Sequence, residues 1–124
     1  MKMFCVALLA LLSTAAQAEL VEVQWDSNGR AAREFNVAPG KFFEWCTKLR
    51  RGEKVQWRFE AGAPLDFNVH YHVGKDVQYP AKHDAVAKAE GSVDVAVDQD
   101  YCWMWSSKRT APGAAVKASL TKQP

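Results

Sequence analysis

Hydrophobic and polar residues alternate along most of this chain beyond residue 20. The clearest run spans residues 65–73, and shorter runs of the same kind span residues 21–25, 55–59 and 93–97. Alternate side chains of a β-strand point to opposite faces, so this period of two predicts strands that are buried on one face. In the longest run, the apolar face carries Leu65, Phe67, Val69, Tyr71 and Val73, and the polar face carries Asp66, Asn68, His70 and His72.

Turn-forming residues separate these runs. Asn28-Gly29 and Pro112-Gly113 are turn dipeptides, and residues 61–64 (Ala-Gly-Ala-Pro) are expected to end the strand over 55–59. Only residues 83–89 have a pattern compatible with a short helical turn. Eight or nine short strands at this spacing predict an all-β fold, an antiparallel β-sandwich, in one domain.

The first residues have the pattern of an export signal. A basic start precedes an apolar run over residues 4–12, and the small-residue site Ala16-Gln17-Ala18 precedes Glu19. We expect residues 1–18 to be a secretory signal peptide that is cleaved after Ala18, which leaves a single domain over residues 19–124. The run is too short to span a bilayer and no second one follows, so we expect a periplasmic or secreted protein without a membrane anchor.

Charge and motifs exclude several classes of function. The 16 basic and 14 acidic residues give a net charge of +2, which argues against a dedicated binder of nucleic acid or anionic membranes. The sequence has no Gly-x-Ser-x-Gly elbow, phosphate-binding glycine loop or zinc-protease helix. We therefore expect a protein that is not an enzyme.

Two cysteines, Cys46 and Cys102, remain after the signal peptide. In an exported protein two cysteines most often pair, because the compartment is oxidising. Such a disulfide would close a loop of 57 residues and stabilise the fold by about 4 kcal/mol. The alternative is a reduced Cys102 whose thiolate binds a metal ion.

The histidines suggest a metal site. His70 and His72 share one face of a predicted strand, and Met104 lies in a second predicted strand that also contains Cys102. Imidazole and thioether ligands suit copper, and the soft sulfur of Met104 favours Cu(I). His83 follows in the next segment and could complete the set, as could Cys102 if it is not oxidised. The competing interpretation is that these histidines are ordinary surface residues.

Residues 42–121 resemble the GOLD (Golgi-dynamics) domain, the lumenal β-sandwich of cargo receptors. The resemblance rests on an ordered set of motifs: Phe43-Glu44-Trp45-Cys46, Gly52-Glu53-Lys54-Val55, Leu65-Asp66-Phe67, Gly74-Lys75-Asp76-Val77, Gly91, Tyr101-Cys102 and Ser106-Ser107-Lys108. The resemblance implies a disulfide between Cys46 and Cys102 and a protein partner. The histidine pair is not part of the family's pattern, and the chain ends before the coiled coil and membrane helix of its receptors. A looser similarity in ligand types links the chain to cupredoxins.

These observations support three functions. The first is a small exported copper-binding protein, a chaperone or resistance factor, with ligands on His70, His72 and Met104. The alternative is a GOLD-like interaction module that binds another exported or membrane protein without a metal. A third interpretation is a cupredoxin-type electron-transfer protein, which requires the Cys102 thiolate.

Overall fold

The computed structural model describes residues 19–123, which form a single all-β domain. Its strands form one seven-stranded sheet in the order β1-β3-β6-β4-β7-β2, and β5 pairs with β4 along the remaining edge of that strand. The strands are β1 (Glu19–Glu22), β2 (Arg30–Val37), β3 (Phe42–Leu49), β4 (Lys54–Val73), β5 (Asp76–Asp94), β6 (Gln99–Ser106) and β7 (Ala114–Gln123).

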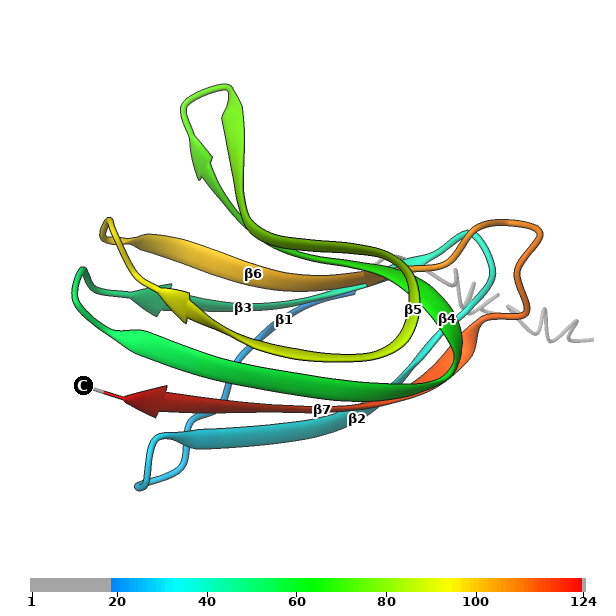
Figure 1. Ribbon diagram of the computed structural model, residues 1–124, viewed down its shortest axis with the longest axis horizontal. Coiled ribbons are helices and arrows are strands. Elements are labelled where there is room, and N and C mark those ends of the chain that lie inside the picture. Colours follow the sequence, from blue (N-terminus) through cyan, green and yellow to red (C-terminus); the bar gives the residue numbers. More distant parts are fainter. Residues whose placement is uncertain (1–18, 124) are drawn as a thin grey trace, which may run out of the picture.

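The longest strand, β4, bends the sheet. Its N-terminal half, residues 54–61, pairs with β7, whereas residues 66–70 pair with β6. Between the two halves, residues 61–64 of β4 lie opposite a single residue of β5, Ala87. The β4–β5 ribbon folds back at this point, so that the sheet has two wings that face each other (Figure 1). We call β2, β7 and the first half of β4 the β7 wing, and β1, β3, β6 and the second half of β4 the disulfide wing. Each wing includes the part of β5 that pairs with its half of β4.

Aromatic side chains fill the space between the wings. Phe35 of β2 stacks on Phe43 of β3 with ring centroids 3.9 Å apart. Phe59 in the first half of β4 meets Trp105 of β6 edge to face, with centroids 5.6 Å apart. These contacts cross between the wings, so burial of large aromatic rings holds the bent sheet closed.

Three details of the predicted fold are wrong. The sheet has seven strands rather than eight or nine, because residues 61–64 bend β4 without ending it and β5 is a single strand over Asp76–Asp94. Residues 83–89 are not a helical turn but part of β5, which pairs with β4 over its length. The pairing is also not wholly antiparallel, because β1 runs parallel to β3.

The predicted signal peptide, residues 1–18, lies outside the described residues. Within residues 19–123, the structure contains no helix that is long and apolar enough to cross a membrane.

Candidate functional site

The predicted site residues of β3, β6 and β4 share the outer face of the disulfide wing. Directly paired residues point to the same side of a sheet, and the positions between them, Trp45, Trp103 and Val69, are buried in the core. Two rows of side chains therefore cross the outer face: Cys46, Cys102 and His70 in one row, and Glu44, Met104 and Asn68 in the next.

Cys46 and Cys102 form a disulfide across the β3–β6 pair, with Cα atoms 4.1 Å apart. The predicted pairing is thus confirmed. The alternative ligand set with a Cys102 thiolate is wrong, because a sulfur in a disulfide has no thiolate to offer a metal ion. Glu44, His70 and Cys102 do lie close enough together to resemble a metal site, but the sulfur of Cys102 is already bonded to that of Cys46.

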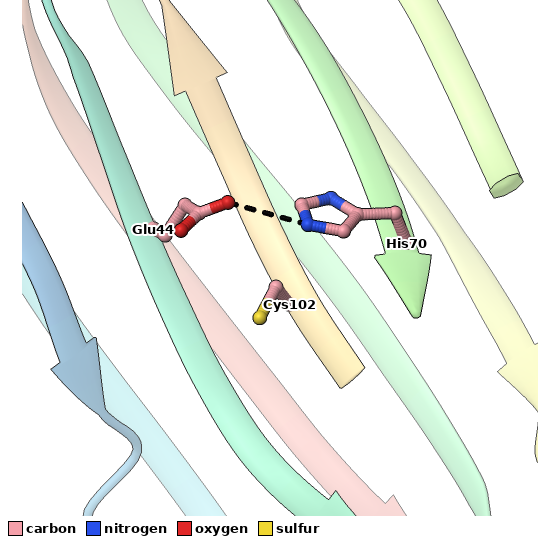
Figure 2. A group of neighbouring side chains, drawn as sticks. All are labelled: Glu44, His70 and Cys102. Atoms are coloured by element: carbon pink, nitrogen blue, oxygen red, sulfur yellow. Dashed lines mark ion pairs between the residues drawn. The ribbon is translucent and has the colours of Figure 1, made fainter. Parts of the chain in front are cut away.

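His70 is held by a polar neighbour at each ring nitrogen. Its Nε2 lies 3.2 Å from Oε1 of Glu44, as Figure 2 shows, and its Nδ1 lies 2.7 Å from Oδ1 of Asn68. The residue is only 5% exposed. A protonated imidazole can donate to both oxygens, whereas a neutral ring can donate to only one of them. His70 is therefore engaged by the protein itself and is not an open ligand.

Burial lowers the pKa of His70 from its ordinary value of 6.5 because the charged ring loses water. The Glu44 carboxylate acts in the opposite direction, and His72 adds to the lowering. His70 thus enters its polar contacts mainly as a neutral ring at neutral pH.

His72 lies further along the same face, where β4 and β5 leave the body as a hairpin. Its ring centroid is 5.4 Å from that of His70, and Gln99 donates a side-chain hydrogen bond to its carbonyl oxygen. The ring of Tyr79 on β5 lies 6.1 Å from His70. His70, His72 and Met104 therefore do share one face, as the sequence predicts, but His72 is exposed while His70 is buried.

His83 cannot join this group, contrary to the prediction. It pairs with Phe67, and its ring packs near Trp57 and Phe67 with centroids 5.8 and 6.2 Å away. Phe67 points into the core, so His83 lies on the opposite side of the sheet from His70. A register shift in the β4–β5 pair, where Tyr79 and Pro80 lie opposite His70 alone, turns His83 to that side.

The sequence pattern does not reveal the other residues of this face. It identifies neither Glu44 as the partner of His70 nor the exposed apolar side chains Leu20, Phe42 and Tyr79 as neighbours of the histidines. Leu20 is paired with Glu44, and Phe42 lies two residues before Glu44 on β3, so both point outward with it. Only the strand order brings these segments together, and no local pattern in the sequence predicts it.

Comparison with known proteins identifies a fold. No family model matches the sequence, and no curated protein matches it. The structure is similar to the Aeromonas hydrophila protein PliG, a periplasmic inhibitor of g-type lysozyme, with a TM-score of 0.67 and 12% identity over 86% of this chain and 98% of that one. It is similar to Salmonella Typhimurium PliG, with a TM-score of 0.60 and 11% identity over 86% of this chain and 100% of that one.

A third similarity is to the pre-peptidase C-terminal domain of a Bacillus anthracis collagenase. Its TM-score is 0.56, with 9% identity over 88% of this chain and 99% of that domain. At these identities the comparisons establish the fold alone. The GOLD resemblance is not tested by any of them and stays a prediction.

The predicted copper-binding function is wrong. The two PliG proteins, which are matched over nearly their whole length, are inhibitors of another protein, g-type lysozyme. The geometry agrees, because the ring nitrogens of His70 face Glu44 and Asn68, Cys102 is oxidised, and His83 lies on the other side of the sheet. The alternative, an interaction module that holds no metal, agrees better with these findings.

Proposed function

We propose that this protein is an exported binding protein that inhibits a g-type lysozyme or a similar hydrolase by direct association. The observation that carries the proposal is the similarity to PliG, which covers 98% of the Aeromonas hydrophila chain and so includes its entire fold. The lower TM-score of the collagenase domain makes the inhibitor the better guide. In this proposal the chain performs no chemical step and holds no metal ion.

The cellular location follows from the same reasoning. The signal-peptide pattern of residues 1–18 and the periplasmic location of the PliG inhibitors both support export, with cleavage after Ala18. A disulfide between Cys46 and Cys102 suits an oxidising compartment such as the periplasm.

Inhibition of a purified g-type lysozyme tests the proposal. The exported chain, residues 19–124, is added at increasing concentration while the clearing of a cell-wall suspension is followed. We expect the rate to fall to a residual level at a fixed molar ratio, and calorimetry to give a dissociation constant for a complex of the two proteins. A chelator should leave both results unchanged, because no metal ion takes part.

A lysozyme of another structural class serves as the specificity control. Undiminished clearing at a large excess of the chain, together with no heat of binding, would rule out the proposed function. Inhibition that disappears when a chelator is added would instead return a metal ion to the mechanism.

A further inference from the structure

We propose that the partner docks on the outer face of the disulfide wing, including the projecting part of the β4–β5 hairpin. This inference rests on the proposed function and assigns its binding surface. The two wings expose two outer faces, and their composition differs in the way that an interface differs from an ordinary solvated surface.

Exposed apolar side chains gather on the disulfide wing. Within residues 19–123, five large hydrophobic side chains are exposed, and three of them lie on this face: Leu20 (66%), Phe42 (38%) and Tyr79 (51%). Met104 lies between them, in the row that contains Glu44 and Asn68. Aromatic residues and methionine are enriched at the cores of protein interfaces, so this composition is typical of a docking surface.

The outer face of the β7 wing has the opposite character. One row of paired residues across it alternates in charge: Glu34, Lys117, Glu60 and Lys88. Lys117 and Glu34 form an exposed ion pair of 3.7 Å. The hollows on this face are lined by charged and small side chains such as Arg58, Glu60 and Ser119. Burying these charged groups at an interface would cost free energy that exposed ion pairs do not recover. We therefore expect this face to remain exposed to solvent in the complex.

The hairpin gives the docking face a projecting edge. Figure 1 shows β4 and β5 continuing beyond β6 and turning away from the body. A two-residue turn, Gly74-Lys75, closes it, with Gly74 at a φ of 60° that favours glycine. The tip carries His72 and Tyr79 on the side of the docking face, and Nζ of Lys82 lies 5.5 Å from the centre of the Tyr79 ring.

The charge of the hairpin indicates what the partner presents. His72 and Lys82 form no ion pair with any other described residue. On the same face the Glu44 carboxylate contacts His70, Asp66 accepts a hydrogen bond from the amide of Ala85, and Asp100 lies opposite Lys48 in the β3–β6 pair. Lysozymes and most other glycosidases carry a pair of carboxylates at the scissile bond. We therefore assign to the partner an apolar surface beside a carboxylate-bearing cleft, with the hairpin at that cleft.

Matched pairs of substitutions test this assignment with purified g-type lysozyme as the probe. The face variant is Phe42→Ala with Tyr79→Ala, and the control variant is Arg58→Ala with Lys117→Ala on the opposite outer face. All four side chains are exposed, so each variant should keep the fold, which near-ultraviolet circular dichroism checks. We expect the face variant to weaken binding at least about tenfold and the control to change it less than about twofold.

The hairpin charges have a separate readout. Lys82→Gln should lower the association rate and its dependence on salt, because charges at an interface act mainly on the encounter. Hydrogen exchange at Gly74 and Lys75 should slow in the complex, because these turn amides form no strand pair in the free protein. Neither measurement requires a variant that disturbs the core.

The outcomes separate the two proposals. If the unmodified chain binds lysozyme, and the face variant binds equally well or the control loses affinity, the surface assignment is wrong and the proposed function stands. If the unmodified chain does not bind, the proposed function fails and the docking face is lost with it. If only the face variant binds more weakly, and hydrogen exchange at Gly74 and Lys75 slows in the complex, the proposed function and the surface assignment are both supported.

Discussion

Reduction of the Cys46–Cys102 disulfide should remove a large part of this protein's stability. The bond joins two residues that already lie opposite each other in the β3–β6 pair. Reduction therefore changes little in the folded sheet, where the strands stay hydrogen bonded. Its main effect is on the unfolded chain, which becomes free to separate the two cysteines.

The expected loss follows from the length of the loop. A sequence separation of 56 closes a loop of 57 residues when both cysteines are counted. The chain-entropy model gives about 4 kcal/mol for a loop of this length. Small domains have a free energy of unfolding of about 5–15 kcal/mol. The reduced protein should therefore be only marginally stable.

Urea unfolding with and without dithiothreitol measures this loss. The reduced wild-type protein keeps the same atoms, so the difference from the oxidised protein isolates the cross-link. The dependence of the unfolding free energy on urea should also steepen on reduction, because the uncrosslinked unfolded chain exposes more surface. The double variant Cys46→Ala with Cys102→Ala is the control, and dithiothreitol should not change its stability.

A loss below about 1 kcal/mol on reduction would refute the reasoning, because the entropic effect of a loop this long should be several times larger. An equal effect of dithiothreitol on the alanine variant would show that the reagent acts elsewhere.

Two further predictions concern His70 and Gly91. Because burial holds the pKa of His70 below 6.5, the unfolded chain takes up the proton first, and stability should decrease as the pH falls from 6.5 toward the folded-state pKa. Melting temperatures of a His70→Gln variant should depend less on pH in this window, and an unchanged slope would contradict the assignment. A Cβ atom at Gly91 would lie 2.7 Å from Cζ2 of Trp57, so Gly91→Ala should cost about 1–3 kcal/mol in urea unfolding. Gly62→Ala, whose nearest neighbour is 4.0 Å away, should cost clearly less, and equal losses would show that crowding by Trp57 is not the cause.

Part of the candidate site was predictable because it depends on local geometry. His70 and His72 share a face, and so do Cys102 and Met104, since alternate residues of any strand point the same way. The disulfide was predictable from the number of cysteines and the export signal. The role of His70 was not, because its partner Glu44 lies on β3, two strands away across β6.

The sequence by itself determined which face of β4 is buried, although Val73 at the end of its predicted apolar face is 50% exposed and His70 on its polar face is buried. The alternation over residues 55–59 and 65–69 predicts the inward positions, and Val55, Phe59, Leu65, Phe67 and Val69 are all at most 2% exposed. This succeeds because the period of two is a property of the strand backbone and needs no knowledge of the neighbouring strands.

The tertiary structure alone decided how the strands combine. Residues 61–64 look like a turn, yet pairing with β5 on both sides of them keeps β4 continuous and turns them into the bend between the wings. The shift at Tyr79 and Pro80 moves His83 away from the other histidines, because a slip of one residue turns every following side chain to the other face. Strand order and register depend on contacts between distant segments, which the local pattern of a sequence does not contain.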